Sequence, residues 1–265
     1  ERMDGKDVTE YFQGYVSVEI RLDEAINRGL LCPFQYFGIT DEVNYKDVKW
    51  SRGKYDHNDL SKLLTGHDLR VDLVLRKLDE YLLDPHQARG LGFCVTKAHA
   101  IFMADQFSSK GIPAAWLTSD SDDDERSQII SRLKAREINF IFSVDLFNEG
   151  VDIPFLDTVL FLRPTDSLTV FLQQLGRGLR GSDEKESLTV LDFIGQHRKE
   201  YKFGHRLKAL VGRSLRNIAT ELEEDFPFLP SGCTIQMEKV AREYVLENIR
   251  RSIDSNQRNL VAAVR

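Results

Sequence analysis

Residues 171–180 contain the side chains of this protein that are best suited to chemistry. The segment reads Phe-Leu-Gln-Gln-Leu-Gly-Arg-Gly-Leu-Arg, so Gln173, Arg177 and Arg180 follow one another at intervals of four and three residues. On a helix these three side chains fall within a sector of roughly 60°. Guanidinium groups keep their charge and donate to phosphate oxygens in parallel pairs. The pattern indicates either a phosphate-facing surface or arginines that pair with the carboxylates at 183–186.

The same segment has an apolar face that requires a sheet behind it. Leu168, Phe171, Leu172 and Leu175 recur at the spacing of a core-facing helical stripe. Glycine in a helix interior costs roughly 1 kcal/mol relative to alanine, so the helix either ends near Gly176 or continues through it. In both cases we expect the arginines to emerge beside the strand ends.

Residues 176–181 also spell Gly-x-Gly-x-x-Gly, a pattern found in dinucleotide-binding proteins. In those proteins the pattern follows a strand and opens a helix, so that the pyrophosphate meets the helix N-terminus. Here it closes a predicted helix and precedes a polar loop. This reversed context argues against a dinucleotide-dependent oxidoreductase.

Strands and helices alternate around this segment. Buried-type strands are predicted at 91–95, 112–117, 138–143, 158–162 and 188–193, and helices of 10–15 residues separate most of them. This alternation predicts right-handed crossovers and a three-layer α/β/α fold with a mainly parallel sheet. Ligands of such sheets bind at the carboxyl ends of the strands. Those ends are predicted at Thr96, 143–152, Arg163 and Asp192.

The flanking segments have a different composition. Residues 1–66 are expected to form a connecting arm with little core of its own, although a helix at 22–31 and a strand at 34–39 are predicted within it. Residues 67–212 form the expected α/β domain, and residues 213–265 a helical extension. Residues 196–217 contain seven Lys or Arg against one acid, Glu200. Such a stretch is either a solvated basic face or part of a strand-binding groove.

Bulk composition sets further limits. The 265 residues are 42% hydrophobic, as expected for a globular chain, and the net charge of −6 argues mildly against a protein that merely coats nucleic acid. The three widely spaced cysteines fit a reducing compartment and exclude a disulfide framework. No apolar run approaches the roughly 20 residues that span a bilayer. We therefore expect a cytoplasmic protein without membrane contact, and a fragment, because the first residue is Glu.

Three motifs in order resemble those of superfamily 2 helicases. Gln-x-x-Gly-Arg-x-x-Arg at 173–180 is similar to motif VI, Ser-Val-Asp-Leu-Phe-Asn-Glu-Gly-Val-Asp-Ile-Pro at 143–154 to motif V, and residues 91–100 to motif IV. The wider chain, including 29–38 and 226–230, resembles DEAD/DEAH-like helicases related to type III restriction-enzyme subunits. The resemblance implies the C-terminal RecA-like lobe of such an enzyme.

The resemblance implies a nucleotide-facing role for one group of residues. Arg177 and Arg180 would be arginine fingers, with Gln173 as a polar contact in the same cleft. Asp152, supported by Gly150, would approach the nucleotide ribose. From its residues alone, the alternative for Asp152 is that it caps a turn before Pro154.

A second group would lie along the nucleic-acid backbone. The resemblance places Thr96, Lys97, Val144 and Asn148 there. The family often has a threonine at the position of Val144, so that contact would depend on a backbone N–H. Thr96 is also suited to cap the helix that begins at Lys97, and one residue can serve both purposes.

The chain contains no Gly-x-x-x-x-Gly-Lys-Ser/Thr motif and no acidic box in a position to hold magnesium. ATP and Mg²⁺ would therefore require a preceding N-terminal RecA-like lobe, which this chain lacks. The expected function is the C-terminal motor lobe of an ATP-dependent helicase or translocase that acts on nucleic acid, DNA rather than RNA. The chain alone is expected to be inactive. The alternative is a non-catalytic module of the same fold that binds nucleic acid or protein.

Overall fold

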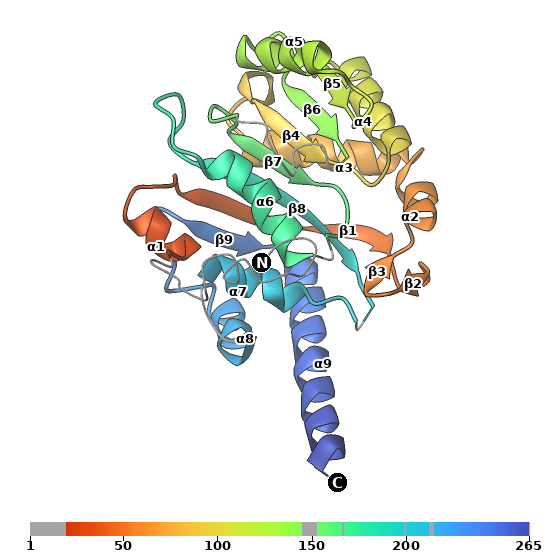
Figure 1. The fold of residues 1–265 in the computed structure, drawn as a ribbon, viewed down its shortest axis with the longest axis vertical. Coiled ribbons are helices and arrows are strands. Elements are labelled where there is room, and N and C mark those ends of the chain that lie inside the picture. Colours follow the sequence, from red (N-terminus) through yellow and green to blue (C-terminus); the bar gives the residue numbers. More distant parts are fainter. Residues whose placement is uncertain (1–19, 145–152, 166, 199, 212–214, 265) are drawn as a thin grey trace, which may run out of the picture.

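A seven-stranded parallel sheet organises the protein (Figure 1). The computed structural model describes the chain apart from residues 1–19, 145–152, 166, 199, 212–214 and 265. The strand order is β5-β6-β4-β7-β8-β1-β9. The strands are β1 (Phe34–Asn44), β4 (Gly90–Phe93), β5 (Ala114–Leu117), β6 (Phe140–Ser143), β7 (Thr158–Phe161), β8 (Leu188–Gln196) and β9 (Thr234–Met237).

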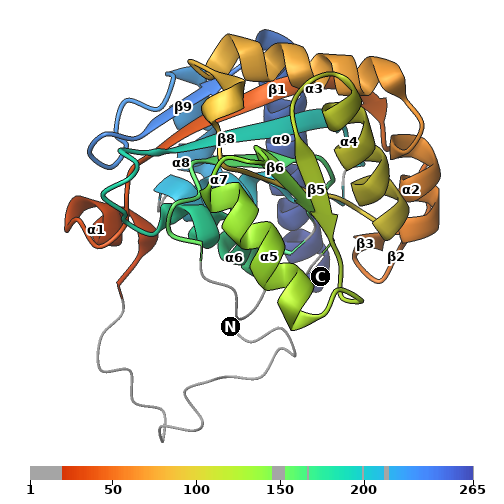
Figure 2. The same cartoon turned by 90° about the horizontal axis from the view of Figure 1, so that it is seen from above.

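Helices cover both faces of the sheet, which confirms the three-layer α/β/α prediction (Figure 2). On one face lie α3 (Asp68–Tyr81) and α4 (Lys97–Ser109). The other face carries α5 (Asp123–Lys134), α6 (Leu168–Leu179), α7 (Phe203–Val211), α8 (Leu215–Glu223) and α9 (Lys239–Val264), together with α1 (Leu22–Asn27). Within the described part of the chain, no helix combines the length and the apolar character needed to cross a membrane.

Capping side chains fix where several helices begin. Asp56 precedes α2 (His57–Leu64), Thr96 precedes α4, Asp122 precedes α5 and Ser167 precedes α6. Each of these side chains accepts a hydrogen bond from a backbone N–H in the first helical turn. These bonds satisfy donors that the helix itself leaves free.

Two strands come from the segments expected to flank the α/β domain. β1 pairs with β8 from Phe34–Leu188 to Thr40–Ile194, and β9 pairs with β1 from Gln35–Thr234 to Gly38–Met237. β9 was not predicted, because it has only four residues and follows a proline-rich loop. The lower part of Figure 1 shows α7, α8, α9 and β9 packed around β1 and β8. The sheet therefore crosses the expected boundaries after residues 66 and 212.

Candidate functional site

Helix α6 carries Gln173 and Arg177, Arg180 follows its last residue in an extended conformation, and the apolar side of the helix is fixed to the sheet. Phe171 and Leu175 are fully buried, and the Phe171 ring lies 5.1 Å from that of Phe161 in β7. The helix continues through Gly176 and ends at Leu179, so it does not stop at the first glycine.

The two glycines of the motif have different surroundings. A Cβ on Gly178 would lie 2.3 Å from Leu188 Cδ1, so glycine lets α6 lie against the first residue of β8. A Cβ on Gly176 would meet no atom within 4 Å. Gly176 therefore leaves open space on the outer side of α6, between Gln173 and Arg177.

The arginines emerge beside strand ends, as expected, and the ends are the amino ends. Arg180 forms a bridge with Leu31, and the Cys32 N–H donates to the Leu179 carbonyl at 2.8 Å. Both partners lie just before the start of β1 at Phe34. The reason is that a crossover helix runs back along the sheet, so only its first turn is near the carboxyl ends.

One acceptor on α6 is a candidate ligand contact. Gln173 is half-buried, and its Oε1 atom is buried without a hydrogen-bond partner among the described residues. An unsatisfied buried acceptor costs about 1–3 kcal/mol, so a donor from a ligand would stabilise this site. Arg177 is half-buried and Arg180 is exposed at the end of the same helix. Gly150 and Asp152 lie outside the described residues.

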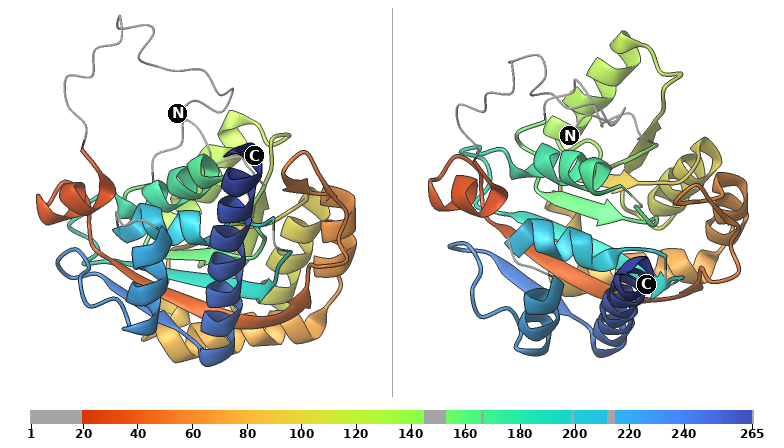
Figure 3. Two further views of the ribbon diagram at one scale, coloured as in Figure 1. Left: turned by 90° about the horizontal axis from the view of Figure 1, so that it is seen from below. Right: turned by 60° about the horizontal axis from the view of Figure 1, so that its bottom comes forward.

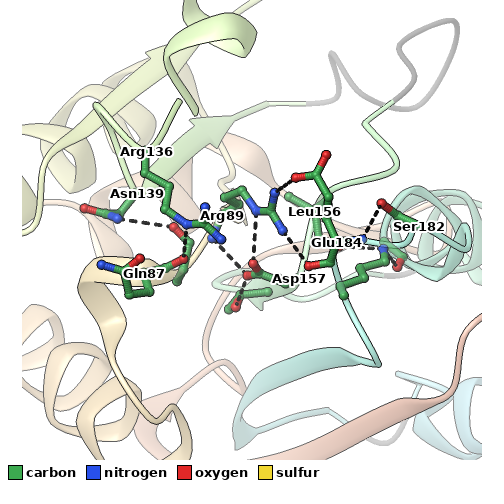
Figure 4. A network of polar contacts seen from close by, with 12 residues as sticks. Gln87, Arg89, Arg136, Asn139, Leu156, Asp157, Ser182 and Glu184 are labelled. Atoms are coloured by element: carbon green, nitrogen blue, oxygen red, sulfur yellow. Dashed lines mark hydrogen bonds and ion pairs between the residues drawn. The ribbon is translucent and has the colours of Figure 1, made fainter. Parts of the chain in front are cut away.

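Arg89 links the segment just before β7 to the turn after α6 (Figure 4). It is 1% exposed and precedes β4. Its Nε donates to Asp157, just before β7, at 3.3 Å. Its Nη1 pairs with the Glu184 carboxylate and its Nη2 donates to the Glu184 carbonyl at 3.1 Å, in the turn after α6. This Arg89 clamp was missed from the sequence, because its acidic partners are 68 and 95 residues away.

Lys185 adds a second link between the same segments. Its Nζ donates to the Leu156 carbonyl at 2.7 Å and to the Gly178 carbonyl at 2.5 Å. Gly178 is in the last turn of α6, where carbonyl groups lack helical partners. Burial lowers the pKa of Lys185, although Cys32 and Asp157 oppose that shift. The end of α6 and the segment after residue 152 are thus fixed relative to each other.

Replacing Arg89 with alanine is expected to destabilise the chain by about 2–4 kcal/mol, because the change leaves Asp157 without its charged partner and opens a buried space. The measurement is the urea midpoint at neutral pH. Arg28→Ala is the matched control, since Arg28 is exposed and its ion pair within the described residues is a local one with Glu24. A loss below about 0.5 kcal/mol for Arg89→Ala would show that the clamp is not a strong constraint.

Thr96, Lys97 and Val144 lie at the carboxyl edge of two adjacent strands, β4 and β6. Thr96 caps α4 by accepting from the His99 N–H at 3.3 Å, and its hydroxyl is 2.7 Å from that of Ser61 in α2. Lys97 is exposed and forms a 2.9 Å ion pair with Asp120. Val144 is half-buried and packs on the core beneath α3 and α4, and Asn148 lies outside the described residues.

Asp192 and Arg206 form a buried ion pair inside the protein. Asp192 lies in the middle of β8, which extends to Gln196, so it is not at a strand end as predicted. It accepts hydrogen bonds from Tyr36 and from Arg206, which belongs to the basic stretch at 196–217. Arg206 is 3% exposed and lies over three phenylalanine rings at 4.4–5.3 Å. Burial raises the pKa of Asp192, and Arg206 opposes that shift. Arg206 is therefore part of the buried core, although it belongs to the basic stretch.

A buried histidine stacks between tyrosines just beyond β8. The His197 ring lies 4.7 Å from that of Tyr45 and 4.0 Å from that of Tyr201, nearly parallel to both. Its Nδ1 is 3.2 Å from the Tyr55 hydroxyl. Burial, and secondarily the charge of Arg206, lowers the pKa of His197 to about 3. The ring is therefore neutral when the protein is folded.

This low pKa predicts a dependence of stability on pH. Unfolded His197 takes up a proton below about pH 6.5 while the folded protein does not, so its contribution to stability is present above pH 6.5 and is lost as pH falls toward 3. Between pH 7.5 and 5.0 the loss from this residue is about 2 kcal/mol. His197→Phe keeps a stacked ring without this titration, so its free energy of unfolding should fall less over that range. Equal pH slopes in urea melts of both proteins would contradict the assignment.

Residues 74–182 match the family model of the helicase conserved C-terminal domain. "Putative ATP-dependent helicase IRC3" of Saccharomyces cerevisiae is 30% identical over 172 residues, which are 65% of this chain and 25% of that protein. The type I restriction enzyme EcoKI endonuclease subunit of Escherichia coli is 33% identical over 135 residues, covering 46% of this chain and 12% of that one.

A solved structure shares the fold. The ATP-dependent type ISP restriction-modification enzyme LlaBIII, bound to DNA, matches 93% of this chain and 18% of its own, with a TM-score of 0.56 and 15% identity. The chain spans a quarter or less of the length of these three proteins.

Proposed function

We propose that this chain, whose residues 74–182 match the helicase conserved C-terminal domain, is the C-terminal RecA-like lobe of a superfamily 2 helicase and the second motor lobe of an ATP-dependent DNA helicase or translocase. The observation that carries the proposal is the outer face of α6. There an unsatisfied Gln173 acceptor, the open space at Gly176 and Arg177 share one rigidly packed helix, and Arg180 follows its last residue. A cytoplasmic location is part of the proposal.

The residues on α6 fit a nucleotide presented by a preceding lobe. Arg177 and Arg180 are suited to bind phosphate oxygens and to neutralise the charge that develops on them. Gln173 Oε1 accepts a hydrogen bond from the nucleotide or its water, and Gly176 lets the ligand approach the backbone. Gly150 and Asp152 are proposed to contact the ribose. ATP supplies the phosphoryl group that is transferred to water, with Mg²⁺ held by the other lobe.

The nucleic-acid strand is proposed to run along the carboxyl edge of the sheet, past Thr96, Lys97, Val144 and Asn148. This edge and the arginines are at opposite ends of α6, which begins after β7 and ends beside the start of β1. A movement of α6 would therefore displace both the arginines and the residues at the carboxyl edge of the sheet. That arrangement supports coupling between nucleotide turnover and grip on the strand. DNA is proposed over RNA because two of the proteins compared above are restriction enzymes.

The test is to read the coding sequence upstream of residue 1 and to assay the protein that contains both lobes. We expect a phosphate-binding loop with its lysine and a DNA-stimulated, magnesium-dependent ATPase. An upstream region without that lysine, combined with nucleic-acid binding and no turnover, would instead establish the non-catalytic binding module.

A further inference from the structure

We propose that residues 46–54 form a second contact with the nucleic-acid backbone, separate from Thr96 and Lys97. These residues comprise Lys46, Lys49 and the hairpin of β2 (Trp50–Ser51) and β3 (Lys54–Tyr55), and we call them the basic hairpin. The inference rests on the proposed function, because it assumes that a strand runs along the carboxyl edge. The basic hairpin adds a second contact surface along that path, and the ligand of this surface is the phosphate groups of the nucleic-acid backbone.

The charges of the basic hairpin are not neutralised within the described structure. Between Tyr45 and Tyr55 there are four cationic residues and one acidic residue, Asp47. The cations, Lys46, Lys49, Arg52 and Lys54, are all exposed. Across the described residues none of them is in an ion pair, and the Lys46 ammonium donates to the Gln196 side chain at 3.0 Å.

Several other exposed cations in the described part of the chain are neutralised by carboxylates. Lys97 pairs with Asp120, Lys110 with Asp72 and Arg250 with Glu223. Exposed, unneutralised cations held close together attract phosphates, and their release of counterions is the main source of nucleic-acid affinity. The basic hairpin is thus suited to an anionic polymer.

The hairpin is held rigidly, so that ordering it on binding costs little. Arg52 and Gly53 have φ values of 51° and 78°, which is the backbone pattern of a tight two-residue hairpin turn. The Trp50 ring lies edge-on to Tyr55 at 4.7 Å. Tyr55 is 2% exposed and its hydroxyl contacts His197 and accepts from the Arg198 N–H. The aromatic stack beyond β8 therefore anchors the base of the hairpin.

Its position makes nucleic acid the partner, rather than an acidic protein. The hairpin follows β1 at the carboxyl edge and leads directly into α2. α2 contacts the start of α4 through the 2.7 Å approach of Ser61 to Thr96. Figures 1 and 2 show β2, β3 and α2 side by side, with α4 next to α2. The basic hairpin thus extends the proposed strand path beyond Thr96.

The test is the salt dependence of binding of the 265-residue chain to a single-stranded oligonucleotide. The variant is Lys49→Gln/Arg52→Gln/Lys54→Gln. The control, Arg28→Gln/Lys110→Gln/Arg132→Gln, removes the same charge from exposed residues that precede β1, β5 and β6, at the other end of the sheet. Unchanged circular dichroism and thermal melts establish that both variants fold.

We expect the slope of log K against log salt to become shallower by about 2 in the hairpin variant, since each lost phosphate contact removes roughly 0.7. The control should match the wild type. If the wild type binds and the hairpin variant has the same slope as the control, the hairpin inference is wrong while the proposed function stands. If the wild type does not bind, the nucleic-acid part of the proposed function fails, and the hairpin inference fails with it.

Discussion

Replacing Arg180 with alanine in the protein that contains both lobes is expected to lower kcat for ATP hydrolysis by roughly 10³–10⁵-fold, the usual contribution of an arginine finger. The physical reason is that the guanidinium stabilises charge that develops on the transferred phosphoryl group. Arg180→Lys keeps the charge but not the paired donors, so we expect it to recover only part of the rate. The measurement is steady-state ATP turnover at saturating DNA.

The affinity for DNA separates this role from a structural one. Arg180 is at the amino ends of the strands, away from Thr96 and Lys97, so Arg180→Ala should leave the Kd for DNA unchanged. Arg28→Ala, an exposed arginine in the segment before β1, serves as the control and should retain full turnover. A kcat for Arg180→Ala within a few-fold of the wild type would remove Arg180 from the phosphate site.

Replacing Asp192 with alanine should cost about 3–5 kcal/mol of folding stability. The change leaves the buried Arg206 guanidinium without its carboxylate and Tyr36 without its acceptor. Arg206 also donates to the Tyr201 hydroxyl at 3.1 Å, and Tyr201 donates to the Thr165 carbonyl close to the start of α6. We therefore expect a lower urea midpoint and faster proteolysis.

A second variant isolates the charge effect from the loss of packing. Asp192→Leu/Arg206→Met removes both charges and fills the site with apolar groups, and such replacements of buried ion pairs are often neutral or stabilising. It should regain most of the stability that Asp192→Ala loses. If both variants were equally unstable, the loss of packing rather than the unpaired charge would account for the lost stability.

Most of the sheet could be predicted from the sequence, because its central strands are short apolar runs separated by helices with clear capping residues. β4, β5, β6, β7 and β8 were predicted to within a few residues. β9 and the hairpin could not be, because their two- to four-residue strands have no periodicity and depend on pairing with distant segments.

The candidate site was predictable in its residue types but not in its placement. Motif spacing identified Gln173, Arg177 and Arg180, and the structure puts the first two on α6 and Arg180 directly after it. Their location at the amino ends depends on the direction of α6 across the sheet, which local pattern does not reveal. The buried ion pairs of Arg89 and Arg206 were not predictable, because the carboxylates that pair with them come from other elements.

The most direct test of the central claim is to compare magnesium-dependent ATP hydrolysis by the purified 265-residue chain with hydrolysis by the protein that adds the preceding lobe. If this lobe supplies arginines to a nucleotide held elsewhere, the chain alone will show no turnover above buffer, and the two-lobe protein will turn over ATP in a manner that requires Arg180. Robust turnover by the isolated chain would contradict the account.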